Sequence, residues 1–172
     1  MIPVAIESLD ALPLIAILRG LKPDEAVEVG EAIVAAAREV ADAGGQLIIS
    51  PNTKVEVIRE TKTLGLLSLP GFFTPSEAFA ALDAGADALK LFPAEIAGPK
   101  GLKAVRAVLP AATRVYPVGG VDPDSMSAWR SAGASGFGIG SAVFKPGQSA
   151  EQVARQAAGF VVEWCDLQST SC

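Results

Sequence analysis

The chain contains no histidine, and this absence removes several kinds of active site. Without an imidazole there is no Ser-His or Cys-His catalytic dyad, no histidine-ligated zinc and no histidine general base. Any catalysis must therefore use lysine, arginine, carboxylates, hydroxyl groups or backbone amides. The two cysteines, Cys165 and Cys172, come too late to build a disulfide framework or a metal site. A reducing, cytoplasmic setting fits this cysteine usage best.

Charge is sparse, and long apolar runs are missing. Only 19% of the residues are charged, and 14 basic against 19 acidic residues give a net charge of −5. This balance disfavours nucleic acid or an anionic membrane as the partner. No stretch is long and apolar enough for a membrane span, and the acidic N-terminal residues do not resemble a signal peptide. We expect a small-molecule partner.

What the chain has instead is apolar content arranged in short pieces. It has 172 residues, half of them apolar, and its mean hydropathy is +0.38. Short apolar runs end in Gly, Pro or Ser, as parallel strands covered on both faces do. These expected strands are residues 14–20, 46–50, 66–71, 88–94, 114–120 and 136–141. Helical patterns follow them at residues 24–37, 53–64, 75–84, 100–108, 123–132 and 149–164. No linker divides these units, so residues 1–172 are expected to form one α/β domain.

The first interval between strands is irregular. The first two expected strands start 32 residues apart, whereas the later intervals are 20 to 26 residues. The intervening pattern reads as helical through Ala37 and Arg38 without a stop signal. Either the first helix is unusually long, or a segment is absent near Ala37/Arg38.

Lys90 is the sharpest chemical feature, because it stands inside the apolar run ALKLF. Burial disfavours a charged ammonium and lowers its pKa toward neutrality, and a neutral amine can form a Schiff base with a carbonyl. Two other interpretations stay open at this point. The lysine could extend to solvent from an edge strand, or it could be half of a buried ion pair.

Arg19 and two glycine-rich strand ends are the other candidates. Arg19 closes the first expected strand, and its planar guanidinium suits a carboxylate. Gly119-Gly120 and Gly140-Ser141 end the last two strands, where barrels commonly hold phosphate on backbone amides. The alternatives are an arginine that is simply exposed and glycines that only form turns. The string GFGIG is only a weak match to a dinucleotide fingerprint, because neither a further strand nor a ribose-binding acid follows it.

Taken in order, the strings ILRG, SPN, ALKLFPAE, PVGGV and GIGSAVFKPGQS resemble the 2-keto-3-deoxy-6-phosphate aldolases. The likeness is greater to the branch acting on 2-dehydro-3-deoxy-6-phosphogalactonate than to the phosphogluconate branch, because the chain has SPN, PVGG and GS at the positions that differ. The resemblance implies a class I aldolase on a (β/α)₈ TIM barrel, without metal or cofactor, that assembles as a homotrimer.

The resemblance also assigns roles to individual residues. It implies that Lys90 is the Schiff-base lysine and that Arg19 orients the keto acid. Gly119, Gly120, Gly140 and Ser141 would contact the sugar phosphate. The reaction would cleave a phosphorylated keto-acid sugar into pyruvate and glyceraldehyde 3-phosphate.

One departure from the family pattern concerns the fold itself. The family has two more strands, the second and third, and a glutamate on one of them is its general acid/base. Neither string is present, and six strands would not close an eight-stranded barrel. The expectation is therefore a TIM barrel from whose sequence two strands are absent near Ala37/Arg38. The competing hypotheses are a phosphogluconate aldolase, another phosphate-binding barrel, and a non-catalytic sugar-phosphate-binding barrel.

Overall fold

A computed structural model describes residues 14–16, 46–145 and 148–169. The strands in these ranges are β1 (Leu14–Ala16), β2 (Leu47–Ile49), β3 (Leu67–Leu69), β4 (Gly71–Phe72), β5 (Leu89–Leu91), β6 (Val115–Pro117) and β7 (Phe137–Ile139). The helices are α3 (Val55–Thr63), α4 (Pro75–Asp83), α5 (Ala94–Arg106), α6 (Pro123–Ser131) and α7 (Ala150–Ser169). Each expected strand within the described ranges is therefore present.

The strands form a parallel arc in which β1 lies beside β7. The paired strands are β2 with β3, β4 with β5, β5 with β6, and β1 with β7, all parallel. Pro70 separates β3 from β4, and a parallel bridge between Val118 and Gly138 links the end of β6 to β7. First strand against last is the arrangement that closes a barrel of successive parallel strands. Within the described ranges, no pairing joins β1 to β2.

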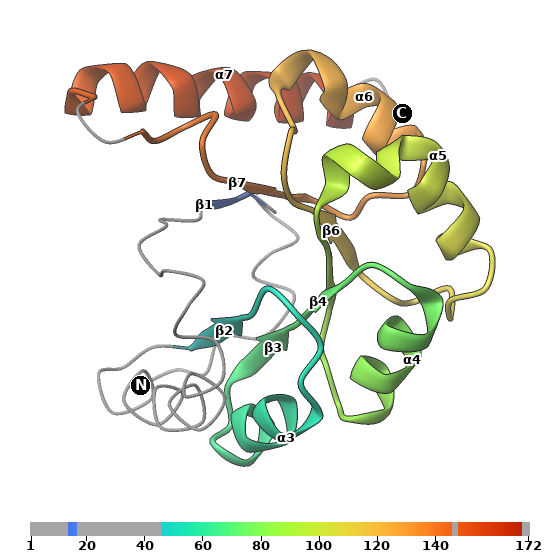
Figure 1. The fold of residues 1–172 in the computed structure, drawn as a ribbon. Helices are drawn as coiled ribbons and strands as arrows, with labels where there is room; N and C mark the ends of the chain where they lie inside the picture. The colour runs from blue at the N-terminus through green and yellow to red at the C-terminus, as the bar shows by residue number, and fades with distance from the viewer. Residues whose placement is uncertain (1–13, 17–45, 146–147, 170–172) are drawn as a thin grey trace.

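Helices cover the outer side of this arc, as Figure 1 shows. The apolar layer between strands and helices includes Leu89 and Leu91 of β5, both at most 1% exposed. A second apolar cluster contains Leu69, Ala88 and Tyr116, with parts of β2 packed against it. Side chains alternate along a strand, so Lys90 shares the face of Ala88 and not that of its two leucine neighbours.

The starts of α4 and α6 agree with the expected ranges, whereas the start of α5 does not. Helices α4 and α6 begin at Pro75 and Pro123, where the expected ranges 75–84 and 123–132 begin, and each follows a capping residue, Thr74 or Asp122. Gly98 has a non-helical φ of 63° inside α5, so the helix consists of two pieces joined at a kink. The expected helix at 100–108 corresponds to the second piece of α5, whereas the first piece, which begins at Ala94, was not expected. The expected helix at 24–37 and the Ala37/Arg38 junction lie outside the described residues.

Candidate active site

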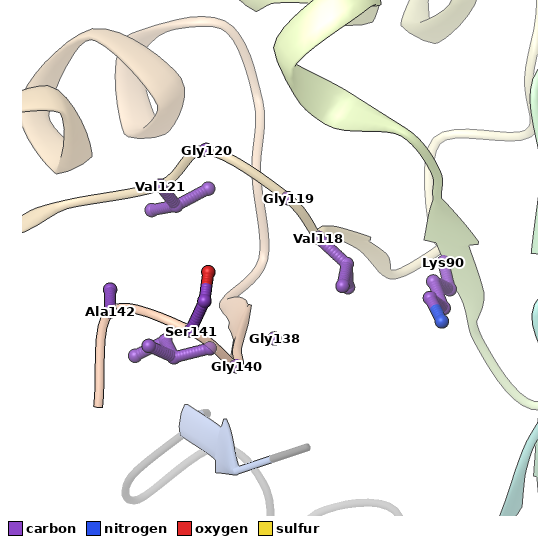
Figure 2. Close-up of a pocket in the computed structure, with 10 residues that line it drawn as sticks. Lys90, Val118, Gly119, Gly120, Val121, Gly138, Gly140, Ser141 and Ala142 are labelled. Atoms are coloured by element: carbon purple, nitrogen blue, oxygen red, sulfur yellow. The ribbon is translucent and has the colours of Figure 1, made fainter. Parts of the chain in front are cut away.

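A pocket opens where β5, β6 and β7 end, which is the edge of a parallel sheet where ligands bind. It is lined by Lys90 and by two backbone stretches, residues 118–121 and 138–142. Figure 2 shows the two stretches facing each other, with Lys90 on the neighbouring strand. The pocket thus brings together five of the six residues selected from the sequence: Lys90, Gly119, Gly120, Gly140 and Ser141. The sixth, Arg19, lies outside the described residues.

Lys90 lines this pocket from β5, the middle strand of the three-stranded sheet β4-β5-β6. It is 7% exposed, and its register partners are Gly71 on β4 and Tyr116 on β6. The edge-strand interpretation is therefore wrong, because β5 is paired on both sides. Its Nζ lies 4.6 Å from the centre of the Phe92 ring. A buried primary amine that opens onto a pocket is placed to react with a carbonyl.

The stretch after β6 has a backbone that requires glycine. Gly119 and Gly120 have φ angles of 105° and 68°, in the region that other residues rarely adopt. The stretch is tied to its neighbour by two backbone hydrogen bonds, from the Val118 amide to the Leu91 carbonyl (3.0 Å) and from the Ala94 amide to the Val118 carbonyl (2.9 Å). These bonds connect the Gly119-Gly120 turn to the end of β5 and the start of α5.

The stretch after β7 lines the same pocket and continues into a tight turn. The amides of Val143 and Phe144 both donate to the Gly140 carbonyl at 3.0 Å, which makes a single helical turn. The amides of Ser141 and Ala142 precede the first bonded residue, so this turn leaves them available. Free amides at the start of a turn attract anions. The arrangement suits a phosphate group.

Three further residues, Phe92, Gly71 and Glu95, lie close to Lys90 or to the glycine stretches. Phe92 belongs to the apolar run ALKLF, and its spacing of two from Lys90 puts it on the same face of the strand. Gly71 ends the expected strand 66–71, and a Cβ there would overlap the carbonyl of Pro51 and lie 2.9 Å from the Asn52 nitrogen. The Glu95 carboxylate lies beside the Gly119-Gly120 turn. The sequence signal for Phe92 is this spacing, and the signal for Glu95 is a carboxylate just past the lysine strand, which made it a possible proton shuttle as well as a possible surface residue.

Metal and membrane chemistry gain no support from the described part of the chain. Its residues include no group of three or more His, Cys, Asp or Glu side chains that could hold a metal ion. No helix within 14–16, 46–145 and 148–169 combines the length and the apolarity that a membrane crossing needs.

Comparison with known proteins gives concordant matches. The 2-dehydro-3-deoxy-6-phosphogalactonate aldolase of Escherichia coli (strain K12) is 39% identical over 191 residues, covering 87% of this chain and 93% of that protein. The probable 2-dehydro-3-deoxy-6-phosphogalactonate aldolase of Rhizobium meliloti (strain 1021) is 38% identical over 186 residues, covering 84% and 88%. A solved structure described as native KDPGal superposes with a TM-score of 0.77 at 38% identity, covering 92% of this chain and 97% of that one.

The lengths of these alignments carry separate information. In the E. coli alignment, 87% of 172 residues is about 150, so about 41 of the 191 positions have no residue of this chain opposite them. The same calculation for the R. meliloti protein takes 84% of 172, about 144, from 186 positions and leaves about 42. Both relatives therefore have about 40 residues without a counterpart here.

The family model described as "Aldolase: KDPG and KHG aldolase" matches residues 1–157. Together with the structural match, this explains the parallel arc, the pairing of β1 with β7 and the placement of the pocket as features of a TIM-barrel type of fold. The chain belongs to the KDPG and KHG aldolase family.

Proposed function

We propose that this protein is a class I aldolase that cleaves 2-dehydro-3-deoxy-6-phosphogalactonate into pyruvate and glyceraldehyde 3-phosphate. The observation that carries the proposal is the placement of Lys90, a buried amine facing a pocket whose other walls are two glycine-containing backbone stretches. Covalent chemistry and phosphate recognition are thereby available in one space. The relatives named for this activity match over most of the chain and support the same substrate.

In the proposed mechanism the Lys90 amine adds to the C2 carbonyl and water is lost, which gives an iminium ion. The C3–C4 bond then breaks as its electrons move to the iminium nitrogen, and the C4 hydroxyl loses its proton. Glyceraldehyde 3-phosphate leaves, and the remaining enamine is protonated at C3 and hydrolysed to pyruvate. Amides at Gly119, Gly120, Gly140 and Ser141 hold the phosphate, and Arg19 orients the carboxylate.

Trapping the imine tests this mechanism. After incubation with pyruvate and reduction with borohydride, peptide mass spectrometry should find the adduct on the peptide containing Lys90. Lys103 is an exposed lysine on α5 and serves as the matched control, so Lys103→Ala should leave the adduct unchanged. A protein that binds pyruvate but shows no adduct at Lys90 would contradict the mechanism.

The competing functions are less well supported. A phosphogluconate aldolase would share Lys90 and the glycine stretches, but the relatives matched over most of the chain have the galactonate name. Turnover of the two C4 epimers under identical conditions distinguishes these enzymes. A non-catalytic sugar-phosphate-binding barrel has no need of a buried lysine in the pocket, and the adduct experiment separates it from an aldolase.

We also propose that a segment holding two strands and the proton-transferring glutamate is missing from this sequence near Ala37/Arg38. The 32-residue first interval, the unpaired β1–β2 side of the described strands and the roughly 40 unmatched positions support this proposal. Two strands with their helices and loops need about that length, since a βα unit takes about 20 to 25 residues. The complete chain would form one domain and assemble as a homotrimer.

Intact mass spectrometry tests the missing segment, and light scattering tests the trimer. We expect a mass above 17.6 kDa for the chain isolated from its natural source. A mass of 17.6 kDa would show that the deletion is genuine, and would move the proposal toward a binding protein without the glutamate.

A further inference from the structure

The side chain of Glu95 lies directly against the Gly119-Gly120 turn. Its Oε2 is 2.9 Å from the position a Cβ would take on Gly119 and 3.1 Å from the equivalent position on Gly120. Because a carbon–carbon bond is about 1.5 Å long, this oxygen lies within about 5 Å of both Cα atoms. Gly119 and Gly120 line the pocket and Glu95 does not, so the carboxylate adjoins the turn without being part of the pocket wall.

No group in the described part of the chain neutralises the charge on Glu95. The side chain is exposed, and within the described residues its carboxylate makes neither a hydrogen bond nor an ion pair. By contrast, Asp122 beyond the turn accepts a hydrogen bond from the Ser125 amide at 2.8 Å and caps α6. An unpaired carboxylate this close to the turn repels an anion bound to the amides of Gly119 and Gly120.

We propose that Glu95 is a positioning residue that limits how tightly the Gly119-Gly120 turn holds a phosphate monoester. The inference rests on the proposed phosphate site and deepens it. A phosphorylated aldehyde has to leave in each turnover, and slow product release commonly limits enzymes. A fixed negative charge behind the amides opposes over-tight binding without touching the ligand.

The test measures binding, and not turnover, with glycerol 3-phosphate as an unreactive probe and glycerol as its unphosphorylated control. Amide chemical shifts of Gly119 and Gly120 are followed by NMR as each compound is added. We expect Glu95→Gln, which keeps the size and removes the charge, to lower the Kd for glycerol 3-phosphate by about three- to tenfold at low salt. At about 1 M salt, where the Debye length is about 3 Å, the difference should largely vanish.

Two further variants separate charge from support of the turn. Asp83→Asn makes the same change in net charge at the far end of α4 and should leave the Kd unchanged. Glu95→Ala should tighten binding as Glu95→Gln does, since both remove the charge. Weaker binding in Glu95→Ala would show that the side chain supports the turn instead, and would overturn the inference.

The outcomes distinguish the two proposals. If the wild-type amides of Gly119 and Gly120 do not respond to glycerol 3-phosphate, the proposed phosphate site is wrong and the inference falls with it. If they respond, and Glu95→Gln has an unchanged or higher Kd at low salt, the phosphate site stands and the role of Glu95 alone is refuted.

Discussion

Two neighbouring strand–helix units, β4–α4 and β5–α5, differ in how their helices begin. Thr74 and Glu77 close the start of α4 in a capping box: the Thr74 amide donates to Glu77 Oε2 at 2.7 Å, and the Glu77 amide donates to Thr74 Oγ1 at 3.3 Å. The start of α5, at Pro93, has no side-chain cap. The acidic residue of its first turn, Glu95, points its carboxylate at the glycine turn.

The two units use their polar side chains for different purposes, one for the stability of a helix and the other for the chemistry of the pocket. In β4–α4 the polar side chains satisfy the backbone of their own helix, so they contribute to folding. In β5–α5, Lys90 lies over the Phe92 ring and lines the pocket, and the Glu95 carboxylate lies beside the Gly119-Gly120 turn. Substitutions in the first unit should therefore reduce stability, and substitutions in the second should change chemistry.

The largest effect should come from Lys90→Met, which removes the amine and keeps an unbranched apolar side chain. We expect no borohydride-reducible adduct with pyruvate and a loss of turnover of about 10⁴-fold or more, because the covalent route is closed. The melting temperature should stay equal or rise, since a buried lysine is replaced by an apolar residue. A large drop in melting temperature would contradict the division between the two units.

Gly71→Ala should have the opposite signature. Its new Cβ would overlap the Pro51 carbonyl, and backbone atoms cannot swing aside as a side-chain end can. We expect urea denaturation to show a loss of about 3 kcal/mol in the free energy of unfolding. Gly159→Ala is the matched control, because its Cβ would have its nearest contact at 3.8 Å and the residue lies within α7. An equal loss in both variants would refute the close approach.

The sequence predicted the elements that have local signals. Thr74-Pro75 and Asp122-Pro123 fix the starts of α4 and α6, because cap and proline act within one turn. It did not predict the start of α5, where no cap residue stands and Gly98 and Pro99 look like a loop. Local patterns give no information about a helix that is positioned by tertiary contacts, such as the hydrogen bond from Ala94 to Val118.

The site residues that could be predicted are those whose residue type is unusual at its own position in the sequence. An isolated lysine in an apolar strand and glycine pairs at strand ends are unusual at their own positions, so Lys90, Gly119, Gly120 and Gly140 were found. The close approach of Pro51 to Gly71 joins residues 20 apart in sequence. Only the folded chain shows such a contact, because it depends on the register of neighbouring strands.

A smaller effect is expected at the cap of α4. Thr74→Ala removes the oxygen that accepts from the Glu77 amide, and we expect it to cost about 1 kcal/mol in the free energy of unfolding. Thr74→Ser keeps the hydroxyl and should remain close to wild type. Identical losses in the two variants, measured by urea denaturation, would mean that the cap does not stabilise α4.

The smallest effect should appear as a pH dependence at Glu77. The amide of Phe73, then the hydroxyl and amide of Thr74, donate to its carboxylate and lower its pKa from the ordinary 4.5. The unfolded chain therefore binds a proton at a higher pH than the folded chain does. The contribution to stability is complete above pH 4.5 and is lost as the pH falls through the lower folded value.

Glu77→Gln isolates this charge, because glutamine keeps an oxygen that can accept the same hydrogen bonds. At pH 7 we expect the variant to be less stable by about 0.5 kcal/mol, a small value because solvent screens this exposed group. The gap between the two proteins should close as the pH falls below 4.5, since the wild-type carboxylate then becomes neutral as well. Urea denaturation at a series of pH values measures this gap. If the stability difference between the two proteins stayed constant down to pH 3, the charge of Glu77 would not be what stabilises the start of α4. The difference between the capped α4 and the uncapped α5 would then depend on side-chain shape and not on charge.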